Sequence, residues 1–169
     1  MTLDPKLKAQ DILPIAVRAE LDAEDIYRAL FGRVKNEVLK QKLDFLANEE
    51  GRHRAILIRL FADKFPARPF VVPDRAARPK AAVAVDDRTP VLDLFKLAMQ
   101  KEKEAEDFYR GSKPRMEDPD SRRTLDYLGR VERSHFYMLK SEIDLLEKFP
   151  EYFDVEDFHV GQDLFHVGP

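Results

Sequence analysis

Six residues in this sequence have the types and the spacing of a metal-binding site. They are Glu20, Glu50, His53, Glu102, Glu132 and His135. Glu50 lies three positions before His53, and Glu132 lies three positions before His135, so on a helix each pair projects from one face. A carboxylate oxygen and an imidazole nitrogen on the same face can bind the same metal ion.

The six residues belong to an internal repeat with a shift of 82 positions. The shift aligns ELDAEDIY at 20–27 with EKEAEDFY at 102–109, and EGRH at 50–53 with ERSH at 132–135. Each half therefore supplies one glutamate followed, at the same interval, by a Glu-x-x-His motif. The second copy tests the first, so the repeat favours one shared site over two chance side-chain pairs.

The repeat also sorts the other acidic residues near these motifs. Glu49 is within helical reach of His53, but its counterpart in the second half is Val131, so Glu49 is excluded. Glu24 and Glu106 do repeat, but they flank the apolar stripes of their helices. We expect these two to be solvated or to support the site from outside.

Buried charge predicts a cation at this site. All four glutamates fall in the middle of apolar stripes, where an unpaired carboxylate costs several kcal/mol. Four carboxylates carry four negative charges, which two divalent ions balance. An oxygen-rich ligand set with one imidazole per ion suits iron or manganese better than copper. We therefore expect two metal ions per chain, iron first and manganese or zinc as alternatives, with His53 on one ion and His135 on the other.

Composition and charge exclude several other classes of site and partner. The sequence has no cysteine, so it contains no disulfide and no thiolate-ligated zinc or iron centre. Its formal net charge of −3 disfavours nucleic acid and anionic membranes as partners. The sequence also lacks the long apolar run of a membrane helix or a signal peptide. We expect a cytoplasmic protein with no nucleic-acid or membrane partner.

Helical periodicity runs through most of the chain and predicts one all-α domain over residues 1–169. The four expected helices cover about residues 11–33, 36–64, 90–110 and 119–149. A proline-rich connection at 66–89 has no period and is long enough to run the length of a helical bundle, so it predicts one crossover. Gly111 is the expected end of the third helix, and residues 150–169 form a short tail of aromatic and acidic residues.

On the motifs quoted above, the sequence resembles the rubrerythrin family of the ferritin-like superfamily over about residues 9–149. The resemblance implies a ferritin-like four-helix bundle with its long crossover between the second and third helices. It also implies a di-iron centre that reacts with hydrogen peroxide or O₂. Tyr27 and Tyr109 would then donate hydrogen bonds that orient the ligand carboxylates.

The sequence departs from the family pattern at two points. Rubrerythrins typically add a cysteine-ligated rubredoxin domain that delivers electrons, and this sequence has no cysteine. An external electron donor protein is therefore expected. Rubrerythrins also carry an extra glutamate three positions after the third-helix ligand, where this chain has Ala105. The standard peroxidase cycle of the family therefore does not follow from the resemblance alone.

The expected function is a rubrerythrin-like oxidoreductase that scavenges peroxide by oxidising Fe(II) with peroxide or O₂. Glu50 and Glu132 would bridge the two ions, Glu20 and Glu102 would be terminal or semi-bridging ligands, and these four would form the catalytic centre. The alternative is a ferroxidase or iron-handling protein that uses the same site. A structural metal scaffold and an oxidase of an organic substrate remain as further alternatives, and a homodimer is the expected assembly.

Overall fold

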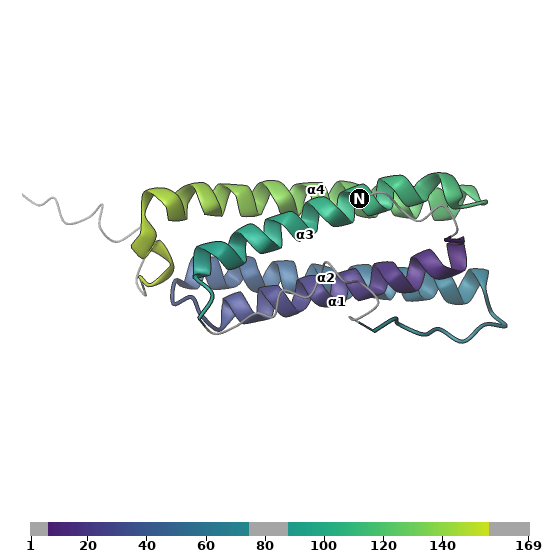
Figure 1. The fold of residues 1–169 in the computed structure, drawn as a ribbon, viewed down its shortest axis with the longest axis horizontal. Helices are drawn as coiled ribbons and strands as arrows, with labels where there is room; N and C mark the ends of the chain where they lie inside the picture. The colour runs from purple at the N-terminus through teal and green to yellow at the C-terminus, as the bar shows by residue number, and fades with distance from the viewer. Residues whose placement is uncertain (1–6, 75–87, 156–169) are drawn as a thin grey trace, which may run out of the picture.

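The computed structural model describes residues 7–74 and 88–155, and these residues form four long helices (Figure 1). The helices are α1 (Ala9–Phe31), α2 (Glu37–Lys64), α3 (Val91–Ser112) and α4 (Pro119–Lys148). Two short 3₁₀ helices follow α3 and α4, at Lys113–Arg115 and Pro150–Phe153, and the described residues contain no strand. The all-α, ferritin-like four-helix bundle predicted from the sequence is confirmed. None of the described helices has the length and apolarity needed to cross a membrane.

Local signals explain where α2 and α4 begin. The side chain of Asn36 accepts a hydrogen bond from the backbone N–H of Leu39 at 3.0 Å. Asp118, its repeat counterpart, accepts one from the backbone N–H of Ser121 at the same distance. Each side chain satisfies a helix-terminal N–H that has no partner within the helix.

The third helix extends past Gly111, where the sequence predicted its end, and continues to Ser112 and a 3₁₀ turn. No glycine in the described part of the chain has a positive φ, so the left-handed conformation that ends many helices at glycine does not form there.

The bundle consists of two helical hairpins. Helix α1 packs along α2 and α3 along α4, and the two hairpins meet chiefly along α1 and α3. Figure 1 places the end of α2 and the start of α3 at opposite ends of the bundle, so the connection between them is a crossover. Residues 75–87 of this connection and 156–169 of the predicted tail lie outside the described residues. Within the described part, Arg18 Nε donates to the carbonyl of Pro73 at 3.1 Å, which holds the start of the connection against α1.

The apolar core is divided into two clusters. One contains residues such as Leu30, Leu43 and Phe95 towards one end of the bundle, and the other contains residues such as Leu13 and Leu125 towards the opposite end. On every helix, a gap in the apolar pattern separates the two clusters. The gaps contain the four glutamates and two histidines singled out from the sequence, which the fold therefore brings to one polar layer between two dry ones.

Candidate metal centre

The polar layer contains six buried side chains whose ligand atoms lie close together. Each of the six is at most 2% exposed. They fall into two overlapping groups, one of Glu20, Glu50, His53 and Glu132, the other of Glu50, Glu102, Glu132 and His135. Within each group the ligand atoms lie within 4.8 Å of one another. Glu50 and Glu132 belong to both groups, as bridging ligands would.

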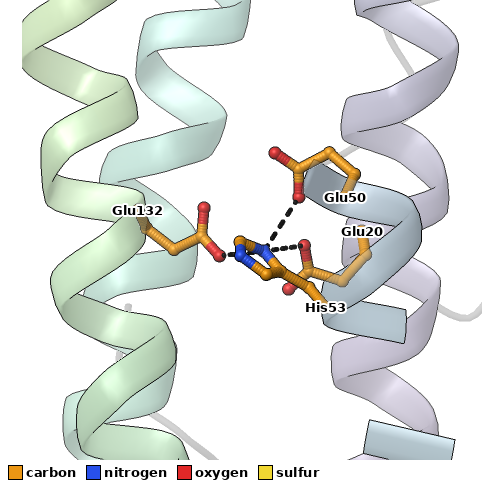
Figure 2. A group of neighbouring side chains, drawn as sticks. All are labelled: Glu20, Glu50, His53 and Glu132. Atoms are coloured by element: carbon orange, nitrogen blue, oxygen red, sulfur yellow. Dashed lines mark hydrogen bonds and ion pairs between the residues drawn. The ribbon is translucent and has the colours of Figure 1, made fainter. Parts of the chain in front are cut away.

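In the first group, the ring of His53 faces carboxylates from three helices (Figure 2). Its Nδ1 lies 2.9 Å from Glu132 Oε1, 3.3 Å from Glu50 Oε2 and 3.4 Å from Glu20 Oε2. Because α1, α2 and α4 each contribute one carboxylate, the group forms only when the two hairpins are packed together.

The second group repeats this arrangement from the other hairpin. His135 Nδ1 lies 3.3 Å from Glu50 Oε1, 3.4 Å from Glu132 Oε2 and 3.5 Å from Glu102 Oε2. The two imidazole rings stack with centroids 5.6 Å apart and planes inclined by 17°. The centre therefore has an approximate two-fold relation that follows the sequence repeat.

Burial and crowding of negative charge shift the proton affinities of the carboxylates. Burial, together with the charge of Glu102, raises the pKa of Glu50 well above its ordinary value. Burial and the charge of Glu132 raise the pKa of Glu102 to about 8. Burial also acts to raise the pKa of Glu132, but its close contacts with the His135 and His53 rings bring it down to about 2. Such coupled groups share their protons, so the cluster titrates as a unit.

The surrounding carboxylates also raise the pKa of both histidines. Burial alone would lower the pKa of His135, but its close contacts with Glu102, Glu132 and Glu50 raise it to about 12. The pKa of His53 is raised by its contacts with Glu132, Glu20 and Glu50, against the opposing effect of burial. The four carboxylates therefore favour positive charge in the space between them, as a proton or as a metal ion.

The residues present fit a pair of metal ions. Several of their buried atoms have no hydrogen-bond partner among the described residues: Glu50 Oε1 and Oε2, Glu102 Oε2, Glu132 Oε1, His53 Nε2 and His135 Nδ1. Buried polar atoms are normally hydrogen-bonded, and an unsatisfied group costs about 1–3 kcal/mol. Metal cations bound among these carboxylate oxygens, with one imidazole for each group, would satisfy the unpaired atoms.

Two tyrosines tie the carboxylates of one hairpin to the other. The hydroxyl of Tyr27 on α1 donates to Glu102 Oε1 on α3, and the hydroxyl of Tyr109 on α3 donates to Glu20 Oε1 on α1. Both tyrosines are fully buried, and burial together with the neighbouring glutamate charges raises their pKa. Both phenols therefore stay protonated and remain donors at neutral pH.

The repeated flanking glutamates lie outside the cluster. Glu24 pairs with Arg54, and Glu106 accepts from Arg133 Nε at 2.8 Å and from Arg110 Nη1 at 3.3 Å. Burial opposes the charged form of Glu106, but hydrogen bonds from Arg133 and Lys103 lower its pKa. These carboxylates are balanced by cationic side chains and play no direct part in the centre.

Sequence reasoning missed one buried carboxylate, Glu142 on α4. It is 3% exposed and forms an ion pair with Lys42 on α2. Its repeat counterpart is Leu60, so the repeat gives no signal for it.

Comparison with known proteins gives one family match and two similar structures. The family profile described as Rubrerythrin matches residues 11–143. A solved structure described as a hypothetical protein from Pyrococcus furiosus is 31% identical, with a TM-score of 0.72 over 83% of this chain and 90% of that one. A structure of CopM in the Cu(II)-bound form is 14% identical, with a TM-score of 0.67 over 82% of this chain and 97% of that one, and this likeness concerns the fold alone. No curated protein sequence matches the chain.

Proposed function

This chain belongs to the rubrerythrin family, and on that premise we propose that it is a di-iron oxidoreductase that reduces hydrogen peroxide. The observation that carries the proposal is the pair of overlapping ligand groups, each with one histidine and three glutamates and with Glu50 and Glu132 in common. One ion would be held by Glu20 and His53, the other by Glu102 and His135, and both by the two shared glutamates.

The chemistry of the donors supports iron over copper. Each group offers three carboxylates and one imidazole, and the sequence has no cysteine to supply a soft thiolate. When bound, a pair of Fe(II) ions supplies the two electrons that, with two protons, convert one hydrogen peroxide to two waters. Electrons must then be returned from outside, so an external electron donor protein is part of the proposal.

Other residues of the chain orient the ligand carboxylates and shield the polar layer from water. Tyr27 and Tyr109 fix the rotation of the carboxylates of Glu102 and Glu20 by donating to one oxygen of each, which leaves the other oxygen free for a ligand role. The two apolar clusters on either side of the layer keep bulk water away, so charges within it interact more strongly than they would in water.

The second candidate function is a ferroxidase, in which iron is the substrate of the same centre. Ala105 favours it, because this residue stands where rubrerythrins carry the extra glutamate linked to peroxide reduction. In that case O₂ would oxidise the bound Fe(II) at least as fast as peroxide does, and the iron would leave the centre after oxidation.

Stopped-flow absorbance on protein loaded anaerobically with Fe(II) tests both candidates. The loaded protein is mixed in parallel with hydrogen peroxide and with O₂, and a Glu50→Gln variant is the control for iron outside the centre. Two irons per chain and much faster oxidation by peroxide are the expected result. Equal or faster oxidation by O₂ would favour the ferroxidase, and failure to bind iron would refute both.

A further inference from the structure

A narrow cleft between α1 and α3 reaches the candidate metal centre from outside. Its lining includes all four glutamates of the centre, Glu20, Glu50, Glu102 and Glu132, and neither histidine. Its cavity volume is about 20 Å³, which is room for about one water molecule. The centre is therefore approached from its carboxylate side.

The cleft lies where the two halves of the repeat face each other. Ten of its eleven lining residues form five pairs related by the shift of 82 positions. They include Ala23 with its counterpart Ala105, and Asp22 with its counterpart Glu104. A passage on this line serves both ligand groups alike, since its lining includes the glutamates of both groups.

Small side chains create the opening. Ala23 and Ala105 each follow a glutamate of the centre by three positions, so they lie one helical turn further along the same face of α1 and α3. Their methyl groups leave the space that any longer side chain at these positions would fill. Helix interfaces are close-packed, so a gap at both counterpart positions is a specific feature of this interface.

The mouth of the cleft is close to charge balance. Lys101 Nζ lies 3.0 Å from Glu104 Oε2, and Arg18 Nη1 lies 3.6 Å from Asp22 Oδ1. Each acidic residue at the mouth thus has a basic neighbour. A passage with this lining selects by size more than by the sign of the charge.

We propose that this cleft is the access passage of the metal centre and that Ala23 and Ala105 set its width. Metal ions and oxidants of about the size of water pass through it, and bulkier hydroperoxides do not. The inference rests on the proposed metal centre and adds a selectivity that the ligand residues themselves do not determine.

The test compares rates of Co(II) loading into the metal-free full-length protein, followed by visible absorbance in a stopped-flow instrument. Ala105→Leu fills the cleft, and Ala29→Leu on a partly exposed stretch of α1 outside it is the matched control. We expect Ala105→Leu to slow loading by about tenfold or more, equal to about 1.4 kcal/mol or more in the barrier, with the final Co(II) content unchanged. The control should load at the rate of the unmodified protein.

Ala105→Gly provides the opposite test and decides the question if the leucine variant fails to fold. It should speed Co(II) loading and, in Fe(II)-loaded protein, raise the rate of oxidation by tert-butyl hydroperoxide relative to hydrogen peroxide. Unchanged loading rates in a folded Ala105→Leu variant, or in Ala105→Gly, would overturn the passage. Unmodified protein that takes up no Co(II) would overturn the proposed metal centre instead, so the two failures are distinct.

Discussion

The two hairpins of the bundle are alike at the centre and different away from it. Counterpart residues supply the ligand groups, and Tyr27 and Tyr109 cross from one hairpin to the other in the same way. Elsewhere the hairpins balance charge only partly in the same way. Glu24 with Arg28 and Glu106 with Arg110 are counterpart pairs. The additional partners differ, because Glu24 also pairs with Arg54 and Glu106 with Arg133, and positions 54 and 133 are not counterparts. The repeat is thus kept fully where both halves build one site and only in part where each half balances its own charges.

Glu142 sharpens the contrast, because it is a buried carboxylate that only one hairpin has. Lys42 from the other hairpin forms an ion pair with it. Within the described residues, the ion pairs of the four central glutamates involve only His53 and His135. A buried acid paired with lysine is a structural contact, whereas four acids that share two imidazoles are short of positive charge, which is what a metal centre requires.

The largest expected effect comes from removing a shared ligand. Glu50→Ala and Glu132→Ala should each lower the affinity for both metal ions. The loss should exceed the ~100-fold that is typical when a residue hydrogen-bonded to a metal ligand is removed. His53→Ala and His135→Ala should each chiefly weaken one ion of the pair. Metal content after equilibrium dialysis, with competition by a chelator, measures the losses. Full loading of both ions in either glutamate variant would contradict the shared-ligand assignment.

The next largest effect concerns the ion pair without a counterpart. Lys42→Met leaves Glu142 without its cation, and we expect the free energy of unfolding to fall by about 2 kcal/mol, below the 3–5 kcal/mol of a fully buried pair because Lys42 is 38% exposed. Urea denaturation measures the change. Lys40→Met, which removes an exposed pair with Glu37, is the control and should cost less than about 0.5 kcal/mol.

A second substitution tests the cause of that loss. The double variant Lys42→Met with Glu142→Leu removes the stranded charge and should recover most of the stability. Metal affinity should be unchanged in both variants, since neither residue contributes to the centre. A double variant as unstable as the single one would show that packing of the lysine stem, and not charge, is the contribution of Lys42.

The sequence predicted the fold and the residues of the layer because both follow from patterns that can be recognised without knowing how the helices pack. Apolar residues at helical spacing define the four helices, and the repeat selects Glu50 over its neighbour Glu49. The pairing of Glu142 with Lys42 was not predictable, because the two residues are 100 positions apart and neither has a similar counterpart. Only the packed bundle brings them together.

Two further features depend on how the hairpins pack. The sequence suggested that Tyr27 and Tyr109 support the site, but it did not reveal that each reaches the glutamate of the opposite hairpin. The cleft was not predictable either, because Ala23 and Ala105 look like ordinary core alanines until α1 is placed against α3.

Removing either of the two tyrosine hydrogen bonds between the hairpins should lower metal affinity moderately and by the same factor. Tyr27→Phe and Tyr109→Phe each leave one carboxylate free to rotate, and we expect each to lower metal affinity by about tenfold. Tyr137→Phe, at a side chain that is 62% exposed, is the control and should have no effect. Isothermal titration with Co(II) compares the three. Strongly unequal losses of metal affinity in Tyr27→Phe and Tyr109→Phe would show that the two ligand groups differ in metal binding despite their similar geometry.

The smallest expected effect is a change in stability at the two counterpart helix caps, Asn36 and Asp118. Hydrogen bonds from Lys64 and Ser121 hold the pKa of Asp118 well below its ordinary value, so Asp118 stabilises the fold above about pH 4, and this contribution is lost as the pH falls further towards the folded-state pKa. Asp118→Asn keeps the cap but loses the charge. It should cost less than about 1 kcal/mol at pH 7, and the difference from the unmodified protein should shrink below pH 4. Urea denaturation at pH 7 and pH 3 measures this.

The reverse exchange should not be neutral. Asn36 is fully buried, and its Nδ2 donates to the carbonyl of Tyr152 at 3.2 Å. Asn36→Asp removes this donor and places a charge beside a carbonyl oxygen, so it should destabilise the protein more than Asp118→Asn does, and most strongly at neutral pH, where the new carboxylate is ionised. Equal costs for the two exchanges would mean that the caps are interchangeable and that the docking of the Pro150–Phe153 turn on the first hairpin contributes nothing to the difference between them.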